Sequence, residues 1–125
     1  MGRVRTDIEV RGRNCWTLFD TGARNTYVSR PVASFLPVSP AEEPYRTGLG
    51  GQIREAREVA VLNAKVEGHP ITTLAFVLEE IGKDEDGKPI EVLLGALAMQ
   101  LWGIRPIPDE ERLDLTHYPT EFIEF

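Results

Sequence analysis

Short runs of β-branched, aromatic and aliphatic residues alternate with glycine, proline and charged residues along this chain. Such runs are typical of strands, because branched and aromatic side chains pack well on a pleated surface. Weak alternation of apolar residues over 4–13, followed by a turn at 12–14, predicts a hairpin. The hairpin leads into an apolar strand at 16–19, and a further short strand is expected at 26–28. The first part of the chain is therefore predicted to be β-structure.

The region that follows contains the proline-rich and glycine-rich parts of the chain. Residues 30–36 are expected to form a short helical turn, since Pro31 is acceptable at a helix start. Three prolines between residues 37 and 44 predict irregular structure up to Tyr45. Residues 45–53 read YRTGLGGQI, in which three glycines surround one leucine. Extended segments on both sides make this stretch a predicted hairpin with a mobile tip.

The second half of the chain alternates between extended segments and turns. Residues 54–62 and 71–78 are predicted to be extended, with the turn between them at 68–70. The charged stretch 79–89 is interpreted as a solvated turn rather than a calcium loop, because it lacks the remaining ligand positions of such a loop. The later predicted elements are a buried strand at 90–94, a short and largely buried helix at 96–102 that ends at Gly103, an irregular polar stretch at 109–119, and a terminal strand at 120–125.

The composition is that of an ordinary globular domain, since 42% of the 125 residues are hydrophobic and 27% are charged. A chain of this length suits one core, and no linker or repeat divides it, so a single domain over residues 1–125 is predicted. No apolar run approaches the ~20 residues of a membrane span, and the first residues lack the apolar core of a signal peptide. A cytoplasmic location without a membrane partner is therefore expected. The net charge of −6 argues against a nucleic-acid partner.

Few side chains in the sequence are suited to metal or thiol chemistry. Cys15 is the one cysteine, so no internal disulfide is possible, and its place in an apolar strand predicts a small core residue. His69 and His117 lie far apart in the sequence, without paired cysteines. Neither a metal site nor a cofactor is therefore expected.

One acidic side chain directly follows the apolar strand at 16–19. Asp20 ends this run, and Thr21, Gly22 and Ala23 follow it. The chain therefore carries a carboxylate out of a buried strand into a tight loop, where Gly22 lets another backbone or a ligand come close. A carboxylate in that position is costly to bury unless it is hydrogen-bonded or functional. A plain turn residue is the alternative interpretation of Asp20.

The glycine-rich tip is the second candidate for function. Leu49 is flanked by Gly48, Gly50 and Gly51 and is predicted to be exposed at the end of its hairpin. An exposed apolar side chain in such a place is expected to contact another molecule, whereas a simple surface turn is the alternative.

Three motifs follow one another along the chain: a strand that ends in Asp-Thr-Gly-Ala, the Gly-Leu-Gly-Gly tip, and Val92-Leu93-Leu94-Gly95 before a short helix. Their order resembles that of the retropepsins, the retroviral-type aspartic proteases, and the resemblance covers nearly the whole chain. It implies a mainly β fold, a closed single-lobe acid-protease barrel with one short C-terminal helix. It also implies a homodimer, because one Asp-Thr-Gly per chain requires a second subunit to supply the second aspartate. The apolar terminal strand would then pair with its symmetry mate.

The resemblance further implies aspartic endopeptidase activity on a peptide or protein substrate, without a cofactor. It assigns catalysis to Asp20, Thr21 and Gly22: paired Asp20 carboxylates activate a water, Thr21 holds the two loops in register, and the Gly22 backbone lies beside the carboxylates. The glycine-rich tip would act as a flap that closes over the substrate. The residues implied in substrate binding are Ala23, Arg24, Asn25, Val28, Gly48, Leu49, Gly50, Gly51 and Leu93.

The sequence departs from the pattern of the viral enzymes in two places. Many viral members have an acidic residue after Asp-Thr-Gly-Ala that pairs with an arginine after the second-motif glycine, whereas this chain has Arg24 and Ala96. Arg24 is therefore expected at the cleft edge, where it favours an acidic group on the substrate. The segment 104–120 is also longer than in the smallest viral enzymes.

The alternative functions are a non-catalytic protease-fold module that binds peptides or scaffolds a partner, and an unrelated small β-barrel binding module.

Overall fold

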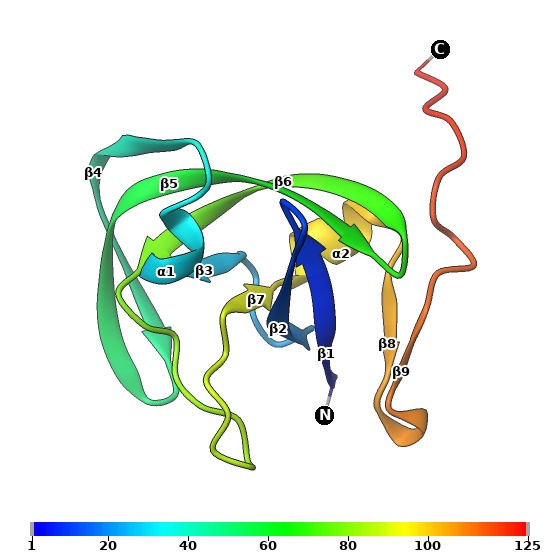
Figure 1. Ribbon diagram of the computed structural model, residues 1–125, viewed down its shortest axis with the longest axis horizontal. Coiled ribbons are helices and arrows are strands. Elements are labelled where there is room, and N and C mark those ends of the chain that lie inside the picture. Colours follow the sequence, from blue (N-terminus) through cyan, green and yellow to red (C-terminus); the bar gives the residue numbers. More distant parts are fainter. Residues whose placement is uncertain (1, 125) are drawn as a thin grey trace.

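Three tight hairpins organise the sheet of the computed structural model, which describes residues 2–124 (Figure 1). They join β1 (Arg3–Val10) to β2 (Arg13–Asp20), β4 (Val38–Leu49) to β5 (Gln52–Val66), and β5 to β6 (His69–Leu78). Both residues of each connecting pair have positive φ, and the second residue is always glycine; the pairs are Arg11–Gly12, Gly50–Gly51 and Glu67–Gly68. Two-residue turns of this kind match the right-handed twist of the strands that they join.

Seven strands form one sheet in the order β1-β2-β7-β3-β6-β5-β4. The short strands β3 (Tyr27–Ser29) and β7 (Val92–Leu94) lie in its middle, with β7 parallel to β2 and β3 parallel to β6. A second pairing, between the end of β1 and β5, curls the sheet toward a barrel. β4 remains an edge strand, so the predicted closed lobe is corrected to a mostly β lobe that is not strictly closed.

The helices are short and lie between strands. α1 (Arg30–Ala33) confirms the predicted helical turn, and η1 (Pro108–Glu110) is a single turn of 3₁₀ helix. α2 (Ala96–Trp102) has its predicted bounds, and Gly103 ends it in the left-handed conformation with φ of 65°. The prediction that α2 is largely buried is wrong, because Leu97 and Leu101 are 50% and 60% exposed. A helix of this length packs with one face, which here carries Ala98 and Met99.

Two local predictions were wrong because pairing partners decide strand limits. β4 includes Pro40 and Pro44, where irregular structure was expected. An edge strand tolerates a missing N–H, and the pairing of β4 with β5 shifts its register between Pro40 and Tyr45. The turn predicted at 68–70 consists instead of Glu67 and Gly68, so that His69 and Pro70 belong to β6.

The C-terminal part of the chain takes a course that the sequence did not predict. β8 (Arg105–Ile107) and β9 (Arg112–Asp114) form a separate two-stranded sheet, partly within the predicted irregular stretch. The predicted terminal strand is wrong for residues 120–124, which form no strand, and Phe125 lies outside the described residues. Phe122 of this segment instead contacts the Trp102 ring, with 5.6 Å between ring centroids, and the nearby Tyr118 ring stacks on Trp102 at 6.0 Å. Figure 1 shows the segment running away from the N-terminal end of the chain.

Buried side chains form two hydrophobic clusters, which lie on opposite faces of the same central strands. The main core contains Phe19, Val28 and Leu94, each 0% exposed, together with Cys15. The second, called here the tip cluster, consists of Leu18, Tyr27, Ala56, Leu78, Ile81, Ile90 and Leu93, with Ala23, Leu49 and Phe76 packed against it. Neighbouring residues of a strand point to opposite faces, which explains why Leu18 and Phe19 belong to different clusters. No helix within residues 2–124 is long and apolar enough to cross a membrane.

Candidate active site

Asp20 is the last residue of β2 and begins the tight loop that was predicted there. The Gly22 N–H donates a hydrogen bond to Asp20 Oδ1 at 2.8 Å, and the Ala23 N–H donates to the Asp20 carbonyl at 3.1 Å. The side chain of Asp20 is 14% exposed. The loop therefore holds one carboxylate oxygen with a backbone donor while the group still reaches the surface.

Arg3 lies beside the other oxygen of this carboxylate. β1 and β2 pair so that Arg3 is directly opposite Asp20, and Arg3 Nε is 3.5 Å from Asp20 Oδ2. The arginine side chain is 54% exposed, so solvent weakens this ion pair. No sequence signal marked Arg3, because its role follows from the register of the hairpin.

Thr21 contacts the start of the chain. Its N–H and its hydroxyl both donate to the Gly2 carbonyl, at 2.9 and 3.2 Å. Gly2 allows this approach, since a Cβ atom at that position would lie 1.7 Å from Thr21 Oγ1. Within the single chain, the Gly2 carbonyl thus accepts the hydrogen bond of the Thr21 hydroxyl, which the resemblance assigned to a contact with the partner's loop.

The loop after Asp20 is fixed against the start of α2. The Ala96 and Leu97 N–H groups donate to the carbonyls of Ala23 and Arg24, at 2.7 and 3.2 Å. A Cβ atom at Gly95 would lie 2.1 Å from the Asn25 carbonyl oxygen, so this close contact requires glycine. The structure therefore brings the first and third sequence motifs together, because β7 also pairs with β2.

The predicted hairpin tip folds down onto the tip cluster. Leu49 is half-buried there rather than exposed. Its hairpin arm is also tied to β3, since the Tyr27 hydroxyl and Thr47 Oγ1 lie 2.7 Å apart. Leu93 is in the same cluster. Val28, expected beside Leu93, is 0% exposed in the main core, and its neighbour Tyr27 takes that place in the tip cluster.

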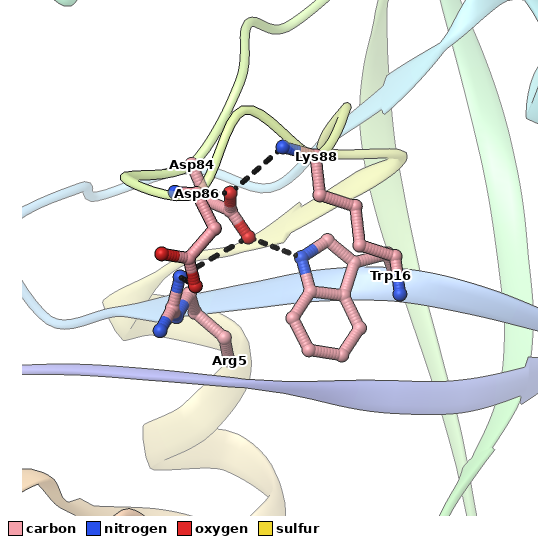
Figure 2. Close-up of polar contacts among 5 residues, drawn as sticks. All are labelled: Arg5, Trp16, Asp84, Asp86 and Lys88. Atoms are coloured by element: carbon pink, nitrogen blue, oxygen red, sulfur yellow. Dashed lines mark hydrogen bonds and ion pairs between the residues drawn. The ribbon is translucent and has the colours of Figure 1, made fainter.

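The loop 79–91 is a part of the site that the sequence did not reveal. It contributes Ile81 and Ile90 to the tip cluster, and Asp84 ties it to β1 and β2 (Figure 2). Asp84 Oδ2 accepts a hydrogen bond from the Trp16 indole at 2.8 Å and lies 3.2 Å from Arg5 Nη1. The turn signal Asp86-Gly87 marked a turn here, but nothing local indicated a partner in β1 or β2.

Asp84 is ionised in this arrangement because donors surround it. Burial of the carboxyl group raises its pKa, but hydrogen bonds from the Lys88 N–H, the Trp16 indole and the Asp86 N–H, together with the Arg5 charge, lower it by more. The net effect is a pKa of Asp84 below its usual range.

Within residues 2–124, neither the cysteine nor a cluster of metal-ligating side chains forms a second reactive centre. Burial, and then the charges of Glu91 and Asp7, raise the pKa of Cys15 to about 11, which keeps the thiol protonated at neutral pH. Cys15 is thus the predicted small core residue, at 2% exposure. Among residues 2–124, no group of three or more histidine, cysteine, aspartate or glutamate side chains is placed to hold a metal ion.

The structure is a single β lobe in which strand β2 leads directly into Asp20-Thr21-Gly22. A glycine-tipped hairpin folds over the adjoining tip cluster. Together these features define a retropepsin-like protein. Residues 6–97 match the family model described as aspartyl protease. Because this match spans most of the chain, the protein belongs to the aspartyl protease family. The match also confirms the resemblance to retropepsins. No curated protein sequence matches the chain.

Solved structures support the same fold. The retroviral protease-like domain of Ddi1 from Leishmania major has a TM-score of 0.65 and 11% identity, over 93% of this chain and 90% of that one. The EIAV protease in complex with the inhibitor HBY-793 has a TM-score of 0.55 and 20% identity, over 84% of this chain and 92% of that one. The simian foamy virus protease has a TM-score of 0.52 and 16% identity, over 82% and 99%. At these identities the likeness establishes the fold alone.

Proposed function

We propose that this protein is an aspartic endopeptidase that hydrolyses peptide bonds as a homodimer. The observation that carries the proposal is the environment of Asp20. Its carboxylate ends a buried strand, reaches the surface, and accepts a hydrogen bond from Gly22 within a retropepsin-like lobe. The chain has one Asp-Thr-Gly, so the second carboxylate comes from a second copy.

Two carboxylates divide the work that one cannot do alone. When two Asp20 side chains meet at a twofold axis, like-charge repulsion makes the pair share one proton, as aspartic proteases generally do. The ionised carboxylate takes a proton from a bound water, which attacks the peptide carbonyl. The protonated carboxyl group hydrogen-bonds the carbonyl oxygen as charge develops there. The rate therefore passes through a maximum as pH varies.

The hairpin at 45–53 and the tip cluster supply the walls of the substrate site in this proposal. Leu49 already packs against this cluster, so the hairpin has an apolar surface to close upon when a peptide lies beneath it. Closure excludes bulk water from the carboxylates and strengthens their interactions with the substrate. Ala23 and Leu93 belong to the same apolar surface.

Dimer formation has to rearrange contacts at the loop. Thr21 donates both of its hydrogen bonds to Gly2 in the single chain, and the contact across the axis would replace at least one of them. Residues 120–124 are not in a strand, so pairing of this segment with its symmetry mate would require it to leave Trp102. Deletion of residues 120–125 tests whether the segment takes part, by sedimentation and by activity.

One observation favours the rival function, a non-catalytic module that binds peptides. Arg3 Nε lies 3.5 Å from Asp20 Oδ2, so a charged side chain of the same chain already contacts the carboxylate that a second Asp20 would have to approach. A binding module retains the lobe and the hairpin but needs no free pair of carboxyl groups.

Asp20→Asn separates the two functions. Wild type and variant are incubated with a diverse peptide pool, with and without a pepstatin-type inhibitor, and cleavage is followed by mass spectrometry. We expect cleavage by wild type, inhibition by the compound, and no cleavage by Asp20→Asn, with the fold and the dimer retained. Asp109 is an exposed aspartate of η1. The variant Asp109→Asn loses a carboxylate that takes no part in the proposed chemistry, serves as the control, and should cleave the peptides normally. Equal cleavage by Asp20→Asn and wild type would refute the proposal.

A further inference from the structure

A cavity of about 350 Å³ lies beside the loop that follows Asp20. Its walls come from the hairpin arm, β6 and α2, and they are mainly apolar: Tyr45, Leu74, Phe76 and Leu97. Ligand pockets of proteins begin at about this volume, which is enough for one bulky side chain of a peptide. Phe76 lines the cavity and also packs against the tip cluster.

The apolar walls are unusually open to solvent. Tyr45, Leu74 and Leu97 are 52%, 66% and 50% exposed, although all three are large hydrophobic residues. The Tyr45 ring is tilted by 49° against that of Phe76, with 4.8 Å between the ring centroids, which gives one wall an aromatic surface. Exposed apolar side chains gathered around one cavity favour a binding surface over scattered surface residues.

Arg24 stands at this cavity as its one charged residue, among the described residues that line it. Its side chain is exposed, and no carboxylate within residues 2–124 lies within ion-pair distance of it. In a chain with a net charge of −6, an arginine left without an acidic neighbour beside an apolar cavity is complementary to a negative group on a ligand.

The backbone of Arg24 is held in place, which makes it a fixed anchor. Its carbonyl accepts a hydrogen bond from the Leu97 N–H at 3.2 Å, and the flanking Ala23 carbonyl accepts from Ala96 at 2.7 Å. The close contact of Gly95 with the Asn25 carbonyl locks the loop against α2. Because the main chain of Arg24 is already held by these contacts, little main-chain freedom is lost when its side chain binds a ligand.

We propose that the cavity and Arg24 together select acidic peptides: a bulky apolar side chain enters the cavity, and the carboxylate of a neighbouring aspartate or glutamate pairs with Arg24. This inference rests on the proposed function, because it names the substrate class of the same site. The apolar residue supplies burial of hydrophobic surface, and the ion pair sets the orientation of the peptide.

Cleavage of a random synthetic peptide library, read by mass spectrometry, tests the inference in wild type, Arg24→Gln and Arg24→Glu. In wild type we expect aspartate or glutamate to be enriched at one fixed distance from the cut, next to a bulky apolar residue. Arg24→Gln should lose the acidic preference, and Arg24→Glu should replace it with a preference for lysine or arginine. For the best peptide and its Glu→Gln analogue, kcat/KM should differ by up to about fivefold in wild type and be nearly equal in Arg24→Gln.

Two controls separate the parts of the site. Arg11→Gln removes the same charge from the β1–β2 turn and should leave the acidic preference unchanged. Leu97→Gln makes one wall of the cavity polar and should weaken the preference for a bulky apolar residue while the acidic preference stays. The preference for the acidic peptide should also fall at high salt, because salt screens an exposed ion pair.

Binding to the inactive protein distinguishes failure of the inference from failure of the proposed function. Asp20→Asn and Asp20→Asn/Arg24→Glu are compared for affinity to the same matched peptides by fluorescence polarisation. Loss of the acidic preference in the double variant supports the inference, even if wild type cleaves nothing and the protein is a binding module. Equal affinity for acidic and neutral peptides in Asp20→Asn overturns the inference, while cleavage by wild type would still support the proposed function.

Discussion

The Trp16 indole donates a hydrogen bond to the Asp84 carboxylate at 2.8 Å, and this contact joins the loop 79–91 to the strand that ends in Asp20. The side chain of Asp84 is only 2% exposed, although it lies in a highly charged loop. Its second oxygen accepts hydrogen bonds from the Asp86 and Lys88 N–H groups, each at 2.9 Å, so it also shapes the turn (Figure 2). Lys88 Nζ lies 3.8 Å from the centre of the Trp16 ring, so a cation–π contact also joins the turn to this indole. Asp84 therefore positions one wall of the tip cluster.

Asp84→Asn should loosen the loop without unfolding the domain. The amide offers one acceptor instead of two charged oxygens, so contacts to Arg5 and to the backbone donors weaken. We expect a lower melting temperature, changed Trp16 fluorescence, and a lower kcat/KM on any peptide that wild type cleaves. Asp86→Asn is the matched control, because the Asp86 side chain is 77% exposed and its carboxylate contacts Arg5 but not Trp16. Equal effects of the two substitutions would argue against a positioning role for Asp84.

Asp84 should also make the stability depend on pH in a defined direction. Its pKa is lower in the folded chain than its usual value, so the unfolded chain binds the proton more readily. The ionised group therefore stabilises the fold above its unfolded pKa near ~3.9, and this contribution disappears as the pH falls through the folded pKa. Urea unfolding should show a stability gap between wild type and Asp84→Asn at neutral pH that narrows below about pH 4. A gap that widens in acid would contradict the assignment.

The turn at the hairpin tip should accept asparagine but not valine at Gly50. Gly50 and Gly51 have φ of 58° and 79°, a conformation that asparagine tolerates and a β-branched residue avoids. Gly50→Val is expected to cost about 1–2 kcal/mol locally and to reduce turnover more than global stability, whereas Gly50→Asn should leave both nearly unchanged. Hydrogen exchange of the 45–53 hairpin and peptide turnover measure the two effects. If Gly50→Val turns over peptides normally at equal folding, the tip is only a turn.

Gly95→Ala should separate the loop after Asp20 from α2. The added methyl group would meet the backbone of Asn25 at 2.1 Å, and backbone atoms cannot move aside as a flexible side chain does. We expect a loss of roughly 1–3 kcal/mol in the free energy of unfolding, together with weaker peptide binding at Arg24. Gly48→Ala is the matched control, since its nearest contact would be the end of Ile53 at 3.9 Å. Chemical denaturation of both variants checks the difference, and an unaffected Gly95→Ala would show that the loop can shift freely.

The features that sequence reasoning located correctly depend on local chemistry. α2 has its predicted bounds because Gly103 supplies the left-handed residue that ends it. The hairpin tip was found because adjacent glycines suit its two-residue turn, and the Asp20 loop because a carboxylate followed directly on an apolar strand. The order of the three motifs was enough to indicate the family, which the match over residues 6–97 bears out.

Tertiary structure alone decided the features that depend on partners distant in the sequence. Pro40 fits in β4 because the strand lies at the edge of the sheet, and Tyr27 rather than Val28 faces the tip cluster because of how β3 is placed between β6 and β7. Arg3 reaches Asp20 through the register of a hairpin.

Two contacts between residues far apart in the sequence, Trp16–Asp84 and Trp102–Phe122, were likewise decided by the tertiary structure. The sequence determined that Asp84 lies in a charged turn, but only the packing of that turn on β2 supplies the Trp16 donor that keeps its carboxylate ionised while buried. It determined that apolar residues follow position 121, but only the tertiary structure places Phe122 against the Trp102 ring rather than in a strand. Local patterns specify which residues can form an element, whereas the free energy of long-range contacts selects the partner that each element meets.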